Sequence, residues 1–182
     1  MKKVAIILAD GFEEIEAISI IDILRRSGIK VEILGYNETT LTGAHDITIL
    51  ADDKFDYYTD LDYDGIIFAG GMKNAQILGQ DEDVMEFIRH YNSDKKLVAG
   101  ICASPSLVLY NAGILDGKDV TCYPDMELIS RMENSNYKDK YVVVCDNIIT
   151  SQSPYSAMAF ALSLVNYFDM DANLLQSQLK GN

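Results

Sequence analysis

Residues 96–112 read KLVAGICASPSLVLYNA. The apolar run ends at Ile101, and a helical pattern begins by Pro105, a residue type that suits the first turn of a helix. Because the link between the two is so short, we expect a sharp strand-to-helix turn with Cys102 at its tip. A buried strand that runs directly into a helix is typical of an α/β domain.

The rest of the chain continues this alternation of short apolar runs and helical patterns. Strands separated by helices of roughly ten residues or more favour βαβ units, and hence a mainly parallel sheet covered by helices on both faces. We predict strands over 3–8, 30–35, 65–68, 96–101 and 120–123, one or two strands across 141–146 and 148–151, and helices over 13–27, 83–91, 104–112, 125–132, 156–168 and 172–179.

One segment departs from this alternation. Residues 39–51, TTLTGAHDITILA, alternate in polarity around Gly43, which predicts an antiparallel hairpin beside the main sheet. The acidic, tyrosine-rich residues 52–64 are expected to form a solvated loop with a short helix. Since we find no internal repeat, low-complexity stretch or linker, we expect residues 1–182 to form a single domain.

The charge balance limits the class of partner. The chain has 182 residues and a formal net charge of -13, with a sequence pI of about 4.4. Phosphate backbones and anionic membrane surfaces are bound by clusters of Lys and Arg. We therefore expect no nucleic-acid partner and no membrane surface as partner.

The cysteines and the N-terminus indicate the compartment. Cys102, Cys122 and Cys145 are an odd number with no close pair, which is a poor disulfide framework and fits a reducing environment. The N-terminal apolar run of residues 4–8 is too short for a signal peptide, and no run approaches the roughly 18 apolar residues of a membrane span. We predict a cytoplasmic protein, with Cys122 and Cys145 in core strands.

The turn at Cys102 carries the strongest chemical signal. The pattern is that of a nucleophile elbow with Cys as the nucleophile, and the small residues Gly100, Ala103 and Ser104 fit so tight a turn. The N-terminus of the following helix favours the thiolate, and the N–H of Ala103 is placed to stabilise an oxyanion. The alternative is a small core residue at the end of a strand, which free Cys often is.

Two glutamates and two glycines are further candidates for functional residues at the same edge of the sheet. Helical projection places Glu13 and Glu16 on the apolar side of their helix, where a carboxyl group is costly unless it is protonated or hydrogen-bonded. Helical spacing alone does not show which of the two glutamates is the functional one. Gly70 and Gly71 follow the strand over 65–68, and their N–H groups can point at a ligand, although an ordinary turn explains them as well.

Histidine and metal motifs are scarce. His90 lies in a polar helix and is expected to be solvated, while His45 in the hairpin is either a surface turn residue or a contributor to a site across a dimer interface. No Cys/His cluster has the spacing of a zinc site, and neither a Walker loop nor GxGxxG is present. We predict neither a metal nor a cofactor.

Together these motifs resemble the ThiJ/PfpI family, and within it the parkinsonism-associated deglycase branch of the class I glutamine amidotransferase-like superfamily. The resemblance runs from Val4 to about Tyr167. It is carried by five motifs: ADGFEEIEA, LRRSGIKV, FAGGMKNA, AGICASPSLVL and ITSQSPYSAMAFALSLV.

The resemblance implies a flavodoxin-like sandwich, a homodimer and specific roles for several residues. Cys102 matches the nucleophile and Glu16, the last acid of GFEEIE, matches its protonated partner. Gly70, Gly71 and Ala103 match the oxyanion donors, and His45 remains a further substrate-binding candidate. The branch is associated with cofactor-free conversion of small 2-oxoaldehydes to hydroxy acids, with repair of glycated side chains, and with a chaperone or peroxide-sensing role.

The chain departs from the family pattern at four positions. Protease-like members carry His where this chain has Ala103, and the deglycase branch often has His at the position of Tyr123. His45 stands in place of an Arg, and Gln152 in place of a basic residue. These departures argue against a Cys-His-acid triad and leave a dyad of Cys102 and Glu16.

Three functions follow as hypotheses. The first is a cysteine-dependent glyoxalase or deglycase that takes a small aldehyde substrate and uses Glu16 to move protons. The second is a redox sensor or chaperone in which Cys102 is oxidised and Glu16 stabilises the sulfinate. The third is a peptidase or amidotransferase-type hydrolase, which requires an imidazole beside Cys102.

Overall fold

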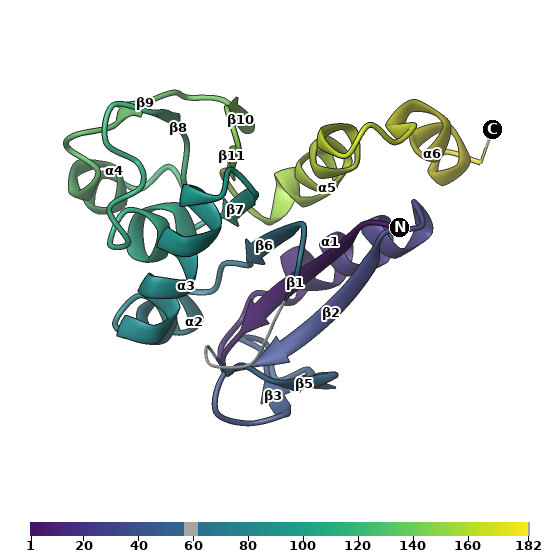
Figure 1. Cartoon of the computed structure of the whole chain (residues 1–182), viewed down its shortest axis with the longest axis horizontal. Helices are drawn as coiled ribbons and strands as arrows, with labels where there is room; N and C mark the ends of the chain where they lie inside the picture. The colour runs from purple at the N-terminus through teal and green to yellow at the C-terminus, as the bar shows by residue number, and fades with distance from the viewer. Residues whose placement is uncertain (57–61, 182) are drawn as a thin grey trace.

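A seven-stranded sheet forms the centre of the part of the chain described in the computed structural model, residues 1–56 and 62–181 (Figure 1). Its strand order is β10-β11-β7-β6-β1-β2-β5, and every neighbouring pair is parallel except β10 and β11. The strands are β1 (Lys3–Leu8), β2 (Lys30–Gly35), β5 (Asp53–Lys54), β6 (Gly65–Phe68), β7 (Leu97–Ile101), β10 (Val142–Cys145) and β11 (Ile148–Ser151).

The register of the central strands brings the candidate motifs together. Ile7 of β1 pairs with Phe68 of β6, and Phe68 pairs in turn with Gly100 of β7. The carboxyl ends of three parallel strands therefore meet at one edge, where ligands bind in open sheets of this kind. This places the segment after β1, the two glycines after β6 and Cys102 after β7 side by side, as predicted.

Helices cover both faces of the sheet, which confirms the predicted mixed α/β architecture. One face is packed by α1 (Glu14–Arg26), α5 (Ala157–Tyr167) and α6 (Ala172–Leu179). The other face is packed by α2 (Met72–Leu78), α3 (Glu82–Ser93), the π-helix η1 (Pro105–Leu109) and α4 (Met126–Arg131) (Figure 1).

The amphipathic pattern of α1 explains how it attaches to the sheet. Ile20 and Leu24 are fully buried, whereas Ile18 is exposed. Each fully buried aliphatic side chain contributes about 1.5–3 kcal/mol relative to exposure. The helix thus has a firmly held inner face, and Glu16 lies on it.

The predicted hairpin is present as β3 (Thr40–Thr42) and β4 (Thr48–Leu50), paired antiparallel. In the acidic segment that follows, the structure has the short strand β5 at Asp53–Lys54. The short helix expected in this segment is not found among its described residues, and residues 57–61 lie outside them. Strand β5 was not predicted because two residues carry no periodic signal.

The strand predicted over 120–123 is confirmed only at Val120. Only Asp119–Val120 is a strand, β8, and it pairs with β9 (Asn136–Tyr137) outside the main sheet. Beyond it the N–H of Thr121 donates to Thr150 Oγ1 at 2.9 Å, and the N–H of Tyr123 donates to the carbonyl of Cys102 at 2.8 Å. Because of these bonds, residues 121–123 run towards the Cys102 turn and do not pair as a strand with a neighbour in the sheet.

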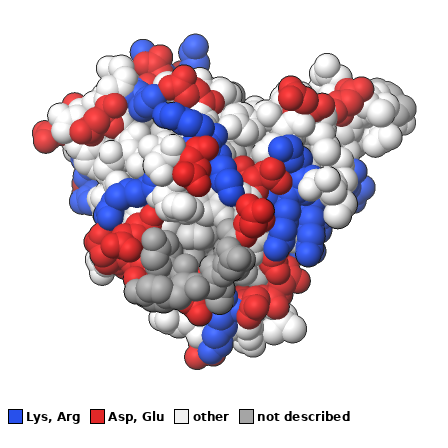
Figure 2. Space-filling model, viewed as in Figure 1, with Lys and Arg blue, Asp and Glu red and all other residues white. Residues whose placement is uncertain are grey.

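The surface shows no broad patch of one charge on the face drawn in Figure 2. Lys and Arg side chains there are interspersed with Asp and Glu. Ion pairs on the surface include Lys2–Asp64, at 2.9 Å, and Lys96–Asp62, at 3.0 Å. Among the described helices, none has the length and apolarity that a membrane crossing would require.

Candidate active site

Cys102 adopts the strained backbone expected of a nucleophile elbow. Its φ angle is 64°, in the left-handed region that non-glycine residues rarely enter. Its N–H donates to the carbonyl of Ser151 at 2.9 Å, and its carbonyl accepts the N–H of Tyr123 at 2.8 Å. Both main-chain bonds join it to distant parts of the chain, which hold the turn in this conformation.

The small residues next to Cys102 also make contacts that hold the turn. Ala103 is buried, and the Ser104 hydroxyl donates to the carbonyl of Ala69 at 2.6 Å. This bond ties the start of the helical segment to the end of β6. The helix expected over 104–112 begins instead as η1, where the N–H of Tyr110 bonds to the carbonyl of Pro105, five residues back, at 2.9 Å.

Glu16 lies beside Cys102 and is completely buried. One carboxyl oxygen, Oε2, accepts the N–H of Gly70 at 2.7 Å. The other, Oε1, is buried without a regular hydrogen bond. A buried carboxylate oxygen that lacks a donor favours the protonated form.

Burial therefore dominates the acid–base properties of Glu16. It raises the pKa of the carboxyl to about 8, and the negative charge of Glu13 adds to this effect. Hydrogen bonds from the Gly70 N–H and from the Cys102 thiol act in the opposite direction and are too weak to cancel it. At neutral pH Glu16 is largely a neutral acid that can donate a proton.

The thiol of Cys102 differs from the sequence-based expectation. Burial is the main cause that raises the pKa of this thiol. The charge of Glu16 in its ionised form and the hydrogen bond to Glu16 act in the same direction. The N–H groups of Gly71 and Ala103 hydrogen-bond to the thiol and lower its pKa only in part. The prediction that the helix terminus makes Cys102 a ready thiolate is wrong, because desolvation outweighs the N–H groups.

The geometry requires glycine at both positions after β6. A methyl group on Gly70 would lie 2.5 Å from Cβ of Cys102 and would collide with the Glu16 carboxyl. Gly71 has a φ angle of 90°, and the carbonyl oxygen of Gly11 stands where its side chain would be. Close approach, rather than an ordinary turn, explains these two residues.

Two further residues organise this edge, and the sequence did not mark the first of them, Asn74, as functional. The fully buried Asn74 accepts the N–H of Ala9 at 2.7 Å and donates to the carbonyls of Ala69 and Gly70 at 2.9 and 3.1 Å. Glu13 caps α1 by accepting the N–H of Glu16 at 2.7 Å. The stretch MKNA carries no periodic signal that would have identified Asn74.

His45 does not face Cys102 within this chain. Its side chain is 71% exposed, and its Nδ1 lies 2.8 Å from Oε2 of the buried Glu14. The hydrogen bond to Glu14 raises the pKa of His45. Burial tends to raise the pKa of Glu14, but the hydrogen bonds from His45 outweigh it, and the net shift is downward.

The same carboxylates form the candidate metal-ligating group of the described residues. Ligand atoms of Glu13, Glu14 and His45 lie within 4.8 Å of one another. Glu13 already accepts the N–H of Glu16, and Glu14 accepts both the N–H and the ring of His45. Hydrogen bonds account for this arrangement, and we assign no metal to it.

In the part of the chain that the structure describes, no hydrogen bond joins the Cys102 sulfur to the side chain of His90, Gln152 or Tyr123. His90 is exposed and lies 3.6 Å from Asp94. The buried Gln152 donates to Asp139 at 3.0 Å, and the Tyr123 side chain is exposed. Cys122 is buried as predicted but lies beyond the end of β8 rather than in a strand, and Cys145 is only half-buried, because it ends the edge strand β10.

Comparison with known proteins places this arrangement in a family. Residues 2–167 match the DJ-1/PfpI family. The chain belongs to this family. Among its relatives, Protein dj-1beta of Drosophila melanogaster is 36% identical over 165 residues, which are 90% of this chain and 87% of that protein. The chain spans only 36% of the length of Protein DJ-1 homolog B of Arabidopsis thaliana, with 33% identity.

A second relative and a solved structure bear on the chemistry. Putative cysteine protease YraA of Bacillus subtilis is 31% identical over 166 residues, covering 91% of this chain and 97% of that protein. The structure of oxidized Toxoplasma gondii DJ-1 has a TM-score of 0.92 and 31% identity, and covers 98% of each chain. The flavodoxin-like fold implied by the sequence resemblance is thereby confirmed.

Proposed function

We propose that this protein is a cofactor-free glyoxalase or deglycase that acts on small 2-oxoaldehydes, or on side chains modified by them, through Cys102 and Glu16. The observation that carries the proposal is the buried Glu16 carboxyl beside the thiol, with a pKa of about 8. An acid of this pKa exchanges protons readily near neutral pH, which is what isomerisation between two adjacent carbons requires.

The chemistry begins with addition of Cys102 Sγ to the aldehyde carbon C1. In its ionised form, Glu16 takes the thiol proton as the S–C1 bond forms and passes it to the former aldehyde oxygen, which gives a hemithioacetal and leaves Glu16 ionised. Glu16 then removes the C1 hydrogen as a proton and delivers it to C2, while the proton of the C1 hydroxyl moves to the C2 oxygen. The product is a thioester with a hydroxyl on C2, and water hydrolyses it to the hydroxy acid and the free thiol.

The N–H groups of Gly71 and Ala103 suit the developing charge. Both hydrogen-bond to the Cys102 thiol in the free protein. When sulfur becomes bonded to C1, the oxygen on that carbon comes within the same region, where fixed main-chain donors stabilise negative charge. This use of the two groups costs little reorganisation because both are main-chain donors, Gly71 at the N-cap of α2 and Ala103 in the turn between β7 and η1.

The test is lactate release from methylglyoxal by freshly reduced protein. Cys102→Ala and Glu16→Gln should each reduce kcat/KM by at least about a hundredfold, the usual contribution of a nucleophile or general base. Cys145→Ser, which alters another partly exposed thiol, should retain wild-type turnover. Equal turnover in Glu16→Gln and wild type would contradict the assignment of Glu16.

A redox sensor is the second candidate, and the oxidized form of one structural neighbour, Toxoplasma gondii DJ-1, favours it. A protonated Glu16 can donate a hydrogen bond to a cysteine sulfinate. Treatment with dilute peroxide followed by mass spectrometry distinguishes the two functions. Preferential oxidation of Cys102 in a protein without methylglyoxal turnover would replace the first proposal with the second.

The peptidase hypothesis has less support. Both histidines of the chain lie among the described residues, and they contact Glu14 and Asp94 rather than Cys102. A cysteine hydrolase needs a base of this kind beside its sulfur. The three cysteines are free thiols, which is consistent with a cytoplasmic location as part of this proposal.

A further inference from the structure

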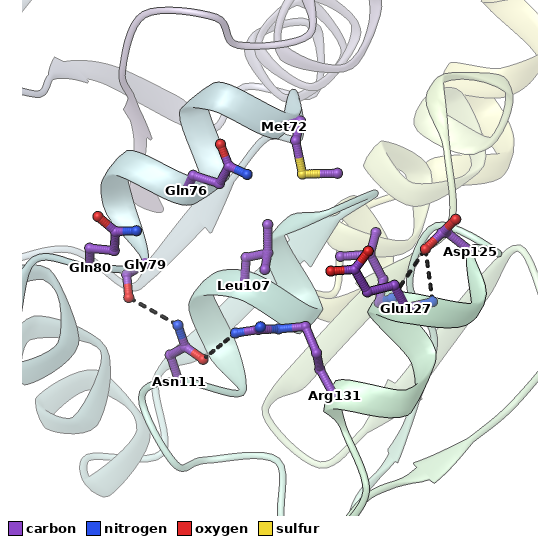
Figure 3. Close-up of a pocket in the computed structure, with 10 residues that line it drawn as sticks. Met72, Gln76, Gly79, Gln80, Leu107, Asn111, Asp125, Glu127 and Arg131 are labelled. Carbon is purple, nitrogen blue, oxygen red and sulfur yellow. Dashed lines mark hydrogen bonds between the residues drawn. The ribbon is translucent and has the colours of Figure 1, made fainter.

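A polar groove of about 360 Å³ lies beside the Cys102 turn and takes no part in the chemistry proposed above (Figure 3). Helix α2 forms one wall, α4 forms the other, and Leu107 of η1 forms part of the floor. Its principal lining residues are Met72, Gln76, Leu107, Asn111, Glu127 and Arg131.

The groove is joined to Cys102 along three separate chain segments. Met72 directly follows Gly71, whose N–H hydrogen-bonds to the thiol. The N–H of Leu107 bonds to the carbonyl of Ala103, one turn after Cys102, at 2.9 Å. Asp125, at the mouth of the groove, donates its N–H to the carbonyl of Tyr123, the residue bonded to Cys102. The lining of the groove is thus continuous in the chain with residues on both sides of the reactive turn.

The charges of the groove are separated along its length. Asp125 and Glu127 lie at the end near Cys102, where Asp125 caps α4 by accepting the N–H of Glu127 at 2.9 Å. Arg131 lies one turn after Glu127 on the same helix, but it is not within ion-pair distance of any acid among the described residues. Its side chain extends along the groove toward Asn111 (Figure 3).

Asn111 orients this guanidinium group at the far end. Asn111 donates to the carbonyl of Gly79 at 3.0 Å, which fixes its amide, and its Oδ1 lies 3.5 Å from Nη2 of Arg131. Gln76 and Gln80 line the same wall with side-chain amides (Figure 3). Amide groups of this type pair with peptide bonds, and an uncompensated guanidinium group pairs with a carboxylate.

We propose that this groove is a substrate subsite for a peptide with a free C-terminal carboxylate, bound with the carboxylate on Arg131 and the reacting carbonyl at Cys102. The acids at the near end disfavour a carboxylate next to the reacting carbon, and Arg131 attracts it at the far end. The inference rests on the proposed use of Cys102, and it names an adduct carried by a peptide, rather than a free small aldehyde, as the preferred substrate class.

The test measures binding without turnover. Wild-type protein labelled with ¹⁵N is titrated with N-acetyl-trialanine as the free acid and as the C-terminal amide, and chemical shifts are followed by NMR. The acid should bind about fivefold more tightly than the amide, as expected for one exposed charge-assisted contact, and should shift resonances of α2, η1 and α4. The preference should weaken as salt is added.

Variants locate the contact. Arg131→Gln should abolish the preference for the acid, and Arg131→Lys should retain part of it because the charge remains. Arg26→Gln, which removes an exposed arginine from α1 on the opposite face of the sheet, should leave the preference unchanged. Equal affinity for acid and amide, absence of binding, or an unchanged preference in Arg131→Gln would each overturn the inference. Because neither peptide carries an aldehyde, this result is independent of methylglyoxal turnover.

Discussion

At the scale of single residues, the burial of Glu16 links its proton to the stability of the fold. Its pKa is about 8 in the folded protein and near 4.5 in an unfolded chain. The protonated carboxyl therefore contributes stability in full below about pH 4.5, and this contribution is lost as the pH rises towards 8. One pKa unit corresponds to about 1.4 kcal/mol, so the loss is on the order of a few kcal/mol.

This linkage predicts how a neutral substitution behaves. Glu16→Gln removes the ionisation, so its free energy of unfolding relative to wild type should increase steadily between pH 5 and pH 8. Urea unfolding at several pH values in that interval measures the difference. Glu127→Gln, the same substitution at an exposed position, is the matched control. A flat difference for Glu16→Gln would mean that this carboxyl has an ordinary pKa.

A second residue-scale prediction concerns Gly70. Gly70→Ala places a methyl group 3.0 Å from Sγ of Cys102 and against Glu16, so the two groups must move apart. A displacement of about 1 Å costs on the order of a hundredfold in rate, and we expect a loss of that size in kcat/KM for methylglyoxal. Gly113→Ala, which also strains a positive φ but meets open space, should lower the melting temperature and leave this activity intact.

The sequence identifies some of these residues more readily than others. Cys102 is predictable because a strand, a nucleophile and a helix follow one another within a few residues. Helical projection could not separate Glu13 from Glu16, since both are buried, at 8% and 0% exposure. What distinguishes Glu16 is a hydrogen bond from Gly70, 54 residues away, and only the fold reveals it.

At the scale of secondary-structure elements, the hairpin depends on one buried carboxylate. Glu14 accepts the main-chain N–H and the ring of His45, and its Oε1 lies 3.5 Å from the N–H of Ile47. Glu14→Ala should lower the free energy of unfolding by on the order of 1–3 kcal/mol, because these donors lose their acceptor. Thermal unfolding monitored by circular dichroism measures it, with Glu127→Ala as the exposed control. No change would show that the hairpin is held by other contacts.

The elements differ in how far the sequence predicts them. Helix α1 and strands β1, β2, β6 and β7 were located closely, because their apolar periodicity extends over a whole element. Helix α2 was missed because it has only seven residues, too few for a clear helical period. Its start is set by the positive φ angle of Gly71, which the sequence does not show. Strand β8 was misplaced because hydrogen bonds to Thr150 and Cys102 govern the following residues.

At the scale of the whole molecule, we propose that the chain pairs with a second copy of itself, as its family resemblance implies. Ile15 and Ile18 are exposed on α1, and Ile47 is exposed on the hairpin that Glu14 joins to this helix. Exposed aliphatic side chains on neighbouring elements are typical of an interface between subunits. A contact here would also bring His45 to the boundary between two copies.

The mass in solution tests this pairing. Light scattering after size-exclusion chromatography should give about twice the mass of 20.3 kDa for wild type. Ile18→Glu should shift the population to the single-chain mass, because it buries a charge in the interface. Met126→Glu, which alters an exposed apolar residue of α4, should remain paired. A wild-type protein with the mass of one chain would refute the proposal.

The main chain of Cys102 is held at both its N–H and its carbonyl by residues far away in sequence, and neither bond involves the sulfur. The main chain thus fixes where the reactive atom lies, while the side chain alone determines which atom it is. Selection can exchange the nucleophile, or retune the acid next to it, without rebuilding the turn. Such a site is well suited to diversification, since new reactivity requires changes in side chains while the architecture is inherited unchanged.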